Sequence, residues 1–206
     1  MRTLRSLRNG LSRRGKKSPD DLSRAKQLLK LKNRVILSLA PSFAAEFPGV
    51  NPGILVGALK QLGFFGVSET AIGADLVSAQ LAEDFSGGGG RKLYISSACP
   101  SAVEYIKRYL GEYAPYITDR ASPLLAHARL LRKLYGEDIG IVFVGPCIAK
   151  KREADVWALP DCSIGFQDLR RWFASEGINL EDGTIRAEEY IPYRAAKGAL
   201  YPVDGG

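Results

Sequence analysis

Short runs of continuous apolar residues alternate along the chain with longer stretches in which apolar positions recur at helical spacing. The runs at 34–40, 92–97 and 139–144 have the length of buried strands, and 162–166 is a weaker run of the same kind. A strand that is apolar along its whole length needs cover on both faces of its sheet. The pattern therefore predicts an α/β fold in which helices flank a mostly parallel sheet.

Capping residues, prolines and glycines mark where the expected helices begin and end. The predicted helices cover residues 19–32, 51–63, 68–85, 100–110, 123–136 and 167–177. Ser68 is the expected cap of the third helix and Ser122 that of the fifth. The glycine run 87–90 is expected to be a linker, and the segment after the last helix is expected to contribute little to the core.

The basic charge of the chain is concentrated near its N-terminus. The net charge is +7, but residues 1–34 alone carry 12 Lys or Arg and 2 Asp, so the remainder is slightly acidic. Residues 1–18 are expected to form a basic, poorly ordered arm, and residues 19–206 a single domain. An Arg-rich stretch without acids is also typical of transit peptides and of segments that bind nucleic acid or an anionic membrane, which leaves those partners as an alternative.

Cysteine content and hydropathy restrict the compartment. Three cysteines are too few, and odd in number, for a disulfide framework, and no apolar segment is long enough to cross a membrane. We therefore expect a soluble, cytoplasmic protein whose thiols are reduced or bound to metal.

Two of the three cysteines follow predicted strands. Cys99 follows the second strand and precedes Pro100 at a helix start, and Cys147 follows the third strand and precedes three cations. Both settings favour the thiolate, and neighbouring strands would bring both sulfurs to one site. On this pattern a metal site, buried structural thiols and a catalytic cysteine all stay open. Cys162 and His127 are expected to be packed in the core.

Three stretches resemble, in order, the C-terminal catalytic domain of the iron-only ([FeFe]) hydrogenase large subunit. They are "SSACPSAVEYIKRYL" (96–110), "ASPLLAHARLLRKLYG" (121–136) and "VFVGPCIAKKREAD" (142–155). A fourth, "LAPSFAAEFPG" (39–49), is similar to the first strand-to-loop segment of the same domain.

The resemblance implies a cofactor and roles for individual residues. Members of the family hold a 4Fe-4S cluster with four cysteines, one of which also bridges to a two-iron unit that carries CO and cyanide. Cys99 and Cys147 match the first two cluster ligands. Lys150 matches the lysine that donates to an iron-bound cyanide, and Glu153 matches the acid that follows it. The wall of the cluster pocket is matched by Pro41, Ser122 and Pro123.

Departures from the family pattern favour its sensory branch over its hydrogen-producing enzymes. Ala98 takes the place of the cysteine that relays protons to the two-iron unit. Gly145 takes the place of a methionine before Pro-Cys, and Gln80 and Leu81 lie near the place of an acidic pair on the proton path. The two-iron unit is therefore doubtful in this chain.

The ligand set is also incomplete. The last two cluster ligands of the family lie in a later C-x3-C motif, and no cysteine follows Cys162. We therefore expect a truncated member of the family. A second chain or domain that carries the C-x3-C ligands would complete it, and a ferredoxin-like protein would donate electrons to it.

Three functions stay open at this point. The first is a 4Fe-4S-binding sensory or electron-transfer domain, or a fragment of one, that is not catalytic as it stands. The second is a hydrogen oxidoreductase whose other half is a separate chain. The third is a metal-free interaction protein that uses the basic arm.

Overall fold

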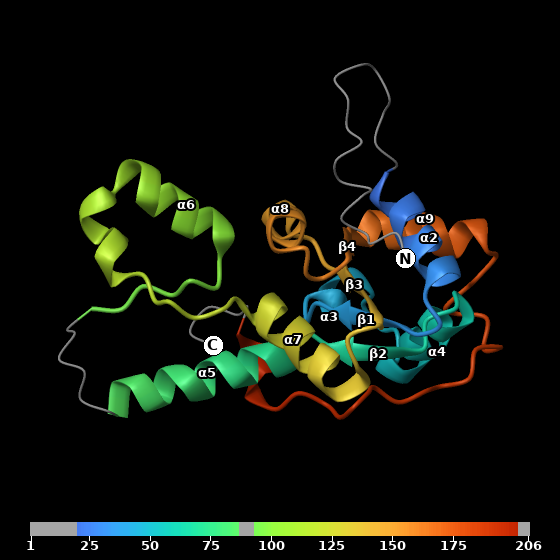
Figure 1. Ribbon diagram of the computed structural model, residues 1–206. Helices are drawn as coiled ribbons and strands as arrows, with labels where there is room; N and C mark the ends of the chain where they lie inside the picture. Colours follow the sequence, from blue (N-terminus) through green and yellow to red (C-terminus); the bar gives the residue numbers. More distant parts are fainter. Residues whose placement is uncertain (1–19, 87–92, 202–206) are drawn as a thin grey trace, which may run out of the picture.

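In the computed structural model, which describes residues 20–86 and 93–201, a four-stranded sheet lies at the centre of the fold (Figure 1). Its strands are β1 (Val35–Leu39), β2 (Gly66–Glu69), β3 (Gly140–Val144) and β4 (Cys162–Ile164). Their order is β2-β1-β3-β4, and every pairing is parallel. The predicted fold class is confirmed.

Helices precede, connect and follow the strands. They are α2 (Asp21–Leu31), α3 (Phe43–Glu46), α4 (Pro52–Gln61), α5 (Ala71–Ser86), α6 (Pro100–Tyr109), the 3-10 helix η1 (Gly111–Tyr116), α7 (Pro123–Tyr135), α8 (Ile148–Trp157), α9 (Phe166–Ser175) and the 3-10 helix η2 (Lys197–Leu200). All six predicted helices are present, whereas α3 and α8 were not predicted. The predicted basic arm (1–18) and glycine linker (87–90) lie outside the described residues.

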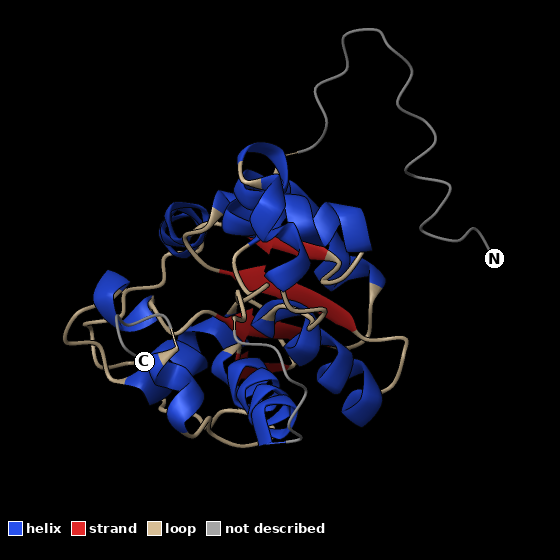
Figure 2. Ribbon diagram, turned by 90° about the vertical axis from the view of Figure 1, so that its left-hand side faces the viewer, coloured by secondary structure: helices blue, strands red, loops and turns tan. Residues whose placement is uncertain are grey.

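The two faces of the sheet bury different residues, because the side chains of a strand alternate between faces. Leu37 and Leu39 of β1 pack with residues of α2, α4 and α9 in the larger core cluster. Ile36 packs with Ala128 and Leu131 of α7 in a smaller cluster. Helices therefore cover both faces of the sheet, as Figure 2 shows.

His127 of α7 lies in a buried polar network at the sheet. Ser38 Oγ is 2.9 Å from its Nδ1, and Ser68 Oγ is 2.8 Å from its Nε2. Ser38 also bonds Thr70 Oγ1 at 2.7 Å. Burial lowers the pKa of His127 to about 3, so the ring is neutral and both ring nitrogens have partners. The expected core position of His127 is confirmed.

The expected helix cap at Ser68 is wrong, because Ser68 lies in β2 and α5 begins at Ala71. This strand is hard to recognise from sequence, since Gly66 and Ser68 bring no apolar side chain to it. The space beside Gly66 is filled instead by the side chain of Ile191, and Ser68 bonds His127.

The expected strand at 92–97 is also wrong, since within its described part only Ile95 pairs, in an isolated bridge with Ile117. The sheet offers this segment no place beside β1, which already pairs with β2 and β3. The segment leads instead into α6 and η1, which lie away from the sheet (Figure 1).

Residues 185–198, which we call the C-terminal strap, are packed on the domain, contrary to the expectation that this region adds little to the core. Ile185 and Tyr190 are buried in the larger core cluster. The backbone N–H of Ile191 donates to Val67 O of β2 at 2.8 Å, and that of Glu188 to Gly53 O at 3.0 Å. The strap has no periodic pattern because much of its attachment uses backbone atoms.

Candidate functional site

Cys99 and Cys147 each lie at the N-terminus of a helix. Cys99 is the N-cap residue of α6, which begins with Pro100, and Cys147 is the N-cap residue of α8. Both are exposed, and neither thiol makes a capping hydrogen bond. Helix N-termini attract anions through their free N–H groups and the helix dipole. The expectation that both cysteines follow strands of the sheet holds for Cys147 and is wrong for Cys99.

Lys150 joins the two segments that carry these cysteines. From the first turn of α8, its ammonium donates to the carbonyl oxygen of Ala98, directly before Cys99, at 2.9 Å. Its backbone N–H donates to the carbonyl oxygen of Cys147 at 3.1 Å. One residue therefore ties the start of α6 to the start of α8.

Glu153 and Ser122 complete the polar cluster around Lys150. Glu153 Oε2 accepts from Lys150 Nζ at 2.8 Å and from Ser122 Oγ at 2.9 Å. Ser122 also caps α7, because its Oγ accepts from the backbone N–H of Leu125 at 3.3 Å. The Lys150 and Glu153 side chains are only 14% and 10% exposed. Their hydrogen bonds and ion pair therefore offset the cost of removing both charges from water. The cluster fixes three helices at one point.

Pro123 adjoins this cluster in sequence, whereas Pro41 lies at one end of the sheet. Pro123 is the first residue of α7, directly after Ser122. Pro41 follows β1 at the point where the N–H of Ala40 donates to Val144 O, the last residue of β3, at 2.9 Å. Pro41 is therefore at the same end of the sheet as the turn that leads to Cys147. A role for either proline in a pocket wall stays a prediction.

Gly145 allows the tight turn between β3 and Cys147. A Cβ at this position would lie 2.6 Å from Phe143 Cζ and 2.9 Å from Ala40 Cβ. Both distances are shorter than a normal van der Waals contact, and Gly145 also donates to Ile164 O at 3.2 Å. The turn therefore packs closely against β1 and β4 and has no room for a side chain.

Gly145→Ala is expected to lower the free energy of unfolding by about 1–3 kcal/mol, because the ring of Phe143 and the chain at Ala40 must move to accommodate the methyl group. Urea unfolding followed by circular dichroism measures the change. Gly111→Ala is the control, since a Cβ at Gly111 meets no atom within 4 Å. Equal midpoints for the two variants would contradict the close packing of this turn.

The exposed cysteines are suitable ligands for an iron-sulfur cluster, but there are only two of them where four are needed. Within residues 20–86 and 93–201, no group of three or more His, Cys, Asp or Glu side chains is placed to hold a metal ion. A 4Fe-4S cluster takes four thiolates, and only Cys99 and Cys147 are exposed thiols. Cys162 is buried as expected; burial raises its pKa to about 12, and its thiol donates to Asp21 O at 3.3 Å. The residues present therefore fit one half of such a site.

Neither helix α8 nor the groove beside it was predicted from the sequence. The groove has a volume of about 890 Å³ and is bounded by α6, η1, the start of α7 and α8. Glu153 and Ser122 lie in its wall, so it adjoins the polar cluster. The run Ala149 to Ala154 consists of strong helix formers and would have revealed α8.

The chain matches a known family and several curated proteins. Residues 33–206 match the family described as "Iron only hydrogenase large subunit, C-terminal domain". The NADP-reducing hydrogenase subunit HndD of Solidesulfovibrio fructosivorans is 29% identical, over 84% of this chain and 35% of that protein. The nuclear prelamin A recognition factor of Mus musculus is 33% identical, over 55% of this chain and 29% of that protein.

Solved structures share the fold. The [FeFe]-hydrogenase HydA(deltaEFG) superposes with a TM-score of 0.70 and 23% identity, over 85% of this chain and 51% of that chain. A variant of [FeFe]-hydrogenase HydA1 from Chlamydomonas reinhardtii superposes with a TM-score of 0.69 and 23% identity, over 85% and 52%. The chain thus spans about half the length of these structures and about a third of the curated relatives. In the described residues, no helix is both long and apolar enough to cross a membrane.

Proposed function

Because the chain belongs to the family of the iron-only hydrogenase large subunit, C-terminal domain, we propose that Cys99 and Cys147 supply two thiolate ligands of a 4Fe-4S cluster. The bond from Lys150 to Ala98 O carries the proposal. It holds two helix N-termini together, each with an exposed cysteine at its N-cap. A chain that used these cysteines only for packing would bury them, as it buries Cys162.

Electrostatics support the same assignment. A cluster bound by thiolates is an anionic group, and helix N-termini and ammonium groups stabilise anions. Lys150 has three N–H donors, of which Ala98 O and Glu153 take two. The third donor is available for an anionic ligand at the cluster, which is the role that the family resemblance gives this lysine. Glu153 and Ser122 keep the ammonium in place.

A second chain or domain supplies the remaining ligands in this proposal. Four thiolates are needed, and this chain offers two, so a partner with a C-x3-C motif brings the others. Sensing or electron transfer, with a ferredoxin-like donor, is favoured over hydrogen turnover because Ala98 has no side-chain proton to relay. Such a cluster would belong in a reducing compartment such as the cytoplasm.

Anaerobic reconstitution tests the ligand assignment. The chain is purified together with a polypeptide that carries the family's C-x3-C motif, and we expect about four iron and four sulfide ions per complex. Cys99→Ser and Cys147→Ser are each expected to lose most of the iron, because one thiolate of four is removed. Iron and sulfide analysis is the measurement.

Cys162→Ala is the matched control for these variants. It also removes a thiol, but a buried one, and it should therefore retain the iron of the unmodified chain. Full iron loading in the Cys99→Ser Cys147→Ser double variant would refute the assignment.

A further inference from the structure

Asp75, near the start of α5, accepts two backbone N–H groups from the end of the C-terminal strap. Its Oδ2 is 2.8 Å from the N of Ala196, and its Oδ1 is 2.6 Å from the N of Gly198. Gly198 permits this approach, because a Cβ there would overlap the carbonyl oxygen of Ala71 and lie 2.8 Å from the N of Asp75. Both oxygens of one carboxylate therefore hold the strap against α5 by charge-assisted hydrogen bonds.

Glu69 holds the same stretch of the strap from the end of β2. Its Oε2 accepts from the backbone N–H of Ala195 at 2.7 Å and from Arg194 Nε at 3.0 Å. The Glu69 side chain is only 8% exposed. A sheltered carboxylate that lost these donors would remain as an unpaired charge, which is costly. The two carboxylates therefore favour one position of the strap end.

Tyr201, directly after η2, reaches the residues that lead to Cys99. We call residues 94–99 the Cys99 segment. The hydroxyl of Tyr201 lies 3.4 Å from Ser96 Oγ. The same Ser96 Oγ accepts from the backbone N–H of Ala98, the residue before Cys99, at 3.2 Å. The position of the strap end is thus linked to the turn that precedes this cysteine.

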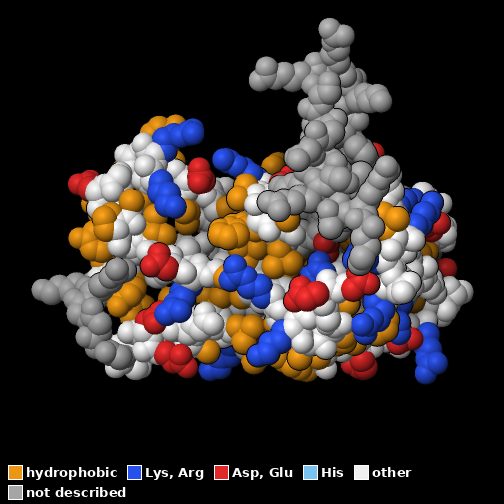
Figure 3. Space-filling view, viewed as in Figure 1, with side chains coloured by type: hydrophobic (Ala, Val, Ile, Leu, Met, Phe, Trp, Pro, Cys, Tyr) orange, Lys and Arg blue, Asp and Glu red, His pale blue; other side chains and the backbone are white. Residues whose placement is uncertain are grey.

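The Cys99 segment is not held by burial of the helix that follows it. None of the residues of α6 is buried, and Figure 3 shows a hollow between α6 and α8. On the side of α8, the link to the segment is the hydrogen bond from Lys150 to Ala98 O. The position of Cys99 therefore depends on individual polar contacts, of which the contact with Tyr201 is one.

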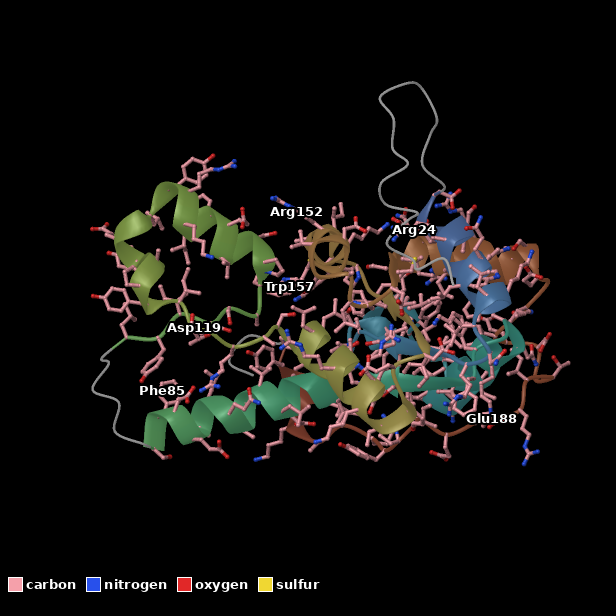
Figure 4. All side chains as sticks on the ribbon, viewed as in Figure 1. Arg24, Phe85, Asp119, Arg152, Trp157 and Glu188 are labelled. Atoms are coloured by element: carbon pink, nitrogen blue, oxygen red, sulfur yellow. The ribbon has the colours of Figure 1, made fainter. Side chains whose placement is uncertain are left out.

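Helix α5 also supports the Cys99 segment, at its other end. Figure 4 shows Phe85 at the end of α5 that lies below this segment, and the ring centroids of Phe85 and Tyr94 are 4.6 Å apart. Asp84 accepts from Arg120 Nε at 2.8 Å, and the carbonyl oxygen of Arg120 accepts from Ser97 Oγ at 2.7 Å. The helix that fastens the strap is therefore the helix on which the Cys99 segment rests.

We propose that Asp75 is a positioning residue for Cys99. By fixing the end of the strap, it keeps Tyr201 at Ser96 and the Cys99 segment in one position. The inference rests on the proposed function in that it concerns one of the two cluster ligands, but the position of the segment can be measured without iron. Loss of the Asp75 carboxylate is expected to loosen both the strap end and the Cys99 segment.

Hydrogen–deuterium exchange of the metal-free full chain, read on peptides by mass spectrometry, tests this coupling. Asp75→Ala is expected to speed the exchange of residues 195–198 about tenfold, since their N–H groups lose a charged acceptor. Residues 95–98 should exchange about threefold faster in the same variant. Tyr201→Phe removes only a hydroxyl, so it should speed the exchange of residues 95–98 and leave residues 195–198 unchanged.

Asp182→Ala is the matched control. Asp182 also accepts a backbone N–H, that of Thr184 at 2.9 Å, but within its own turn. Both segments should therefore exchange as they do in the unmodified chain. Faster exchange of residues 195–198 in Asp75→Ala with no change at residues 95–98 would overturn the positioning role. An unchanged strap in Asp75→Ala, or an equal effect of Asp182→Ala on residues 95–98, would overturn it too.

Iron binding separates this inference from the proposed function. With a polypeptide that carries the C-x3-C motif, Asp75→Ala should release its iron to a chelator about tenfold faster than the unmodified chain, although both thiolates are intact. If the unmodified chain takes up no iron but the exchange results are as expected, the positioning role stands and the cluster assignment is wrong. Iron release at the unmodified rate together with unchanged exchange would overturn the positioning role alone.

Discussion

Gly73→Ala is expected to be the most damaging single-methyl change in the described part of α5. The added Cβ would overlap the carbonyl oxygen of Pro123 and lie 2.8 Å and 2.9 Å from the Cβ and N of His127. These are atoms at the start of α7, mostly backbone, and they cannot move aside without separating α5 from α7. Overpacking commonly costs about 1–3 kcal/mol, and we expect a loss at the upper end or beyond.

The sign of the effect makes this variant informative. In an open helix, alanine is about 1 kcal/mol more favourable than glycine, so helix propensity alone predicts stabilisation. Gly111→Ala, where the new Cβ meets no atom within 4 Å, is again the control. Urea unfolding of the two variants compares them directly. A Gly73→Ala protein as stable as the unmodified chain would show that α5 and α7 do not approach as closely as described.

Acidification is expected to destabilise the protein through His127. The pKa of the buried ring is lowered to about 3 from 6.5, so between these pH values the unfolded chain binds a proton that the folded chain does not. The contribution of this residue is therefore complete above pH 6.5 and is lost as the pH falls. The slope is about 1.4 kcal/mol per pH unit until the folded ring titrates.

His127→Gln isolates this contribution. The amide keeps hydrogen-bonding groups near Ser38 and Ser68 but cannot take up a proton. At pH 7 the variant is expected to be less stable by about 1–3 kcal/mol, because the fit to two buried hydroxyls is lost. The difference in the free energy of unfolding between the two proteins should narrow as the pH falls from 6.5, because only the unmodified protein loses the contribution of His127. The titration of acidic residues, which both proteins share, cancels in this difference. A gap that stays constant down to pH 5 would contradict a neutral, buried His127.

The fold was predictable where apolar runs and caps coincide. β1 and β3 are central strands and fully buried, so their runs are continuous, and Ser122 caps α7 as expected. β2 was not predicted because its positions 66 and 68 carry no apolar side chain. The side chain of Ile191 fills the space beside Gly66, and His127 bonds Ser68. The segment at 92–97 has strand composition, but its described part forms only a bridge to Ile117 outside the sheet, and such a tertiary placement is not visible in a local pattern.

The candidate site was predictable in its residues but not in its geometry. The motifs placed Cys99, Cys147 and Lys150 together, and both cysteines do lie at helix starts. The link to Ala98 is made by a backbone carbonyl, which any residue would offer, so no residue type could reveal it. The groove was hidden for a related reason, because it requires α8, which was not predicted.

The C-terminal strap has a consequence for how the chain is made. Its hydrogen-bond partners Gly53 and Val67 are synthesised well over 100 residues before the strap. The outer edge of β2 therefore stays uncovered until the strap has been synthesised. An uncovered strand edge can pair with other chains. We therefore expect nascent chains that stall before the strap is synthesised to need chaperone protection. Chains whose strap has emerged from the ribosome should not need it.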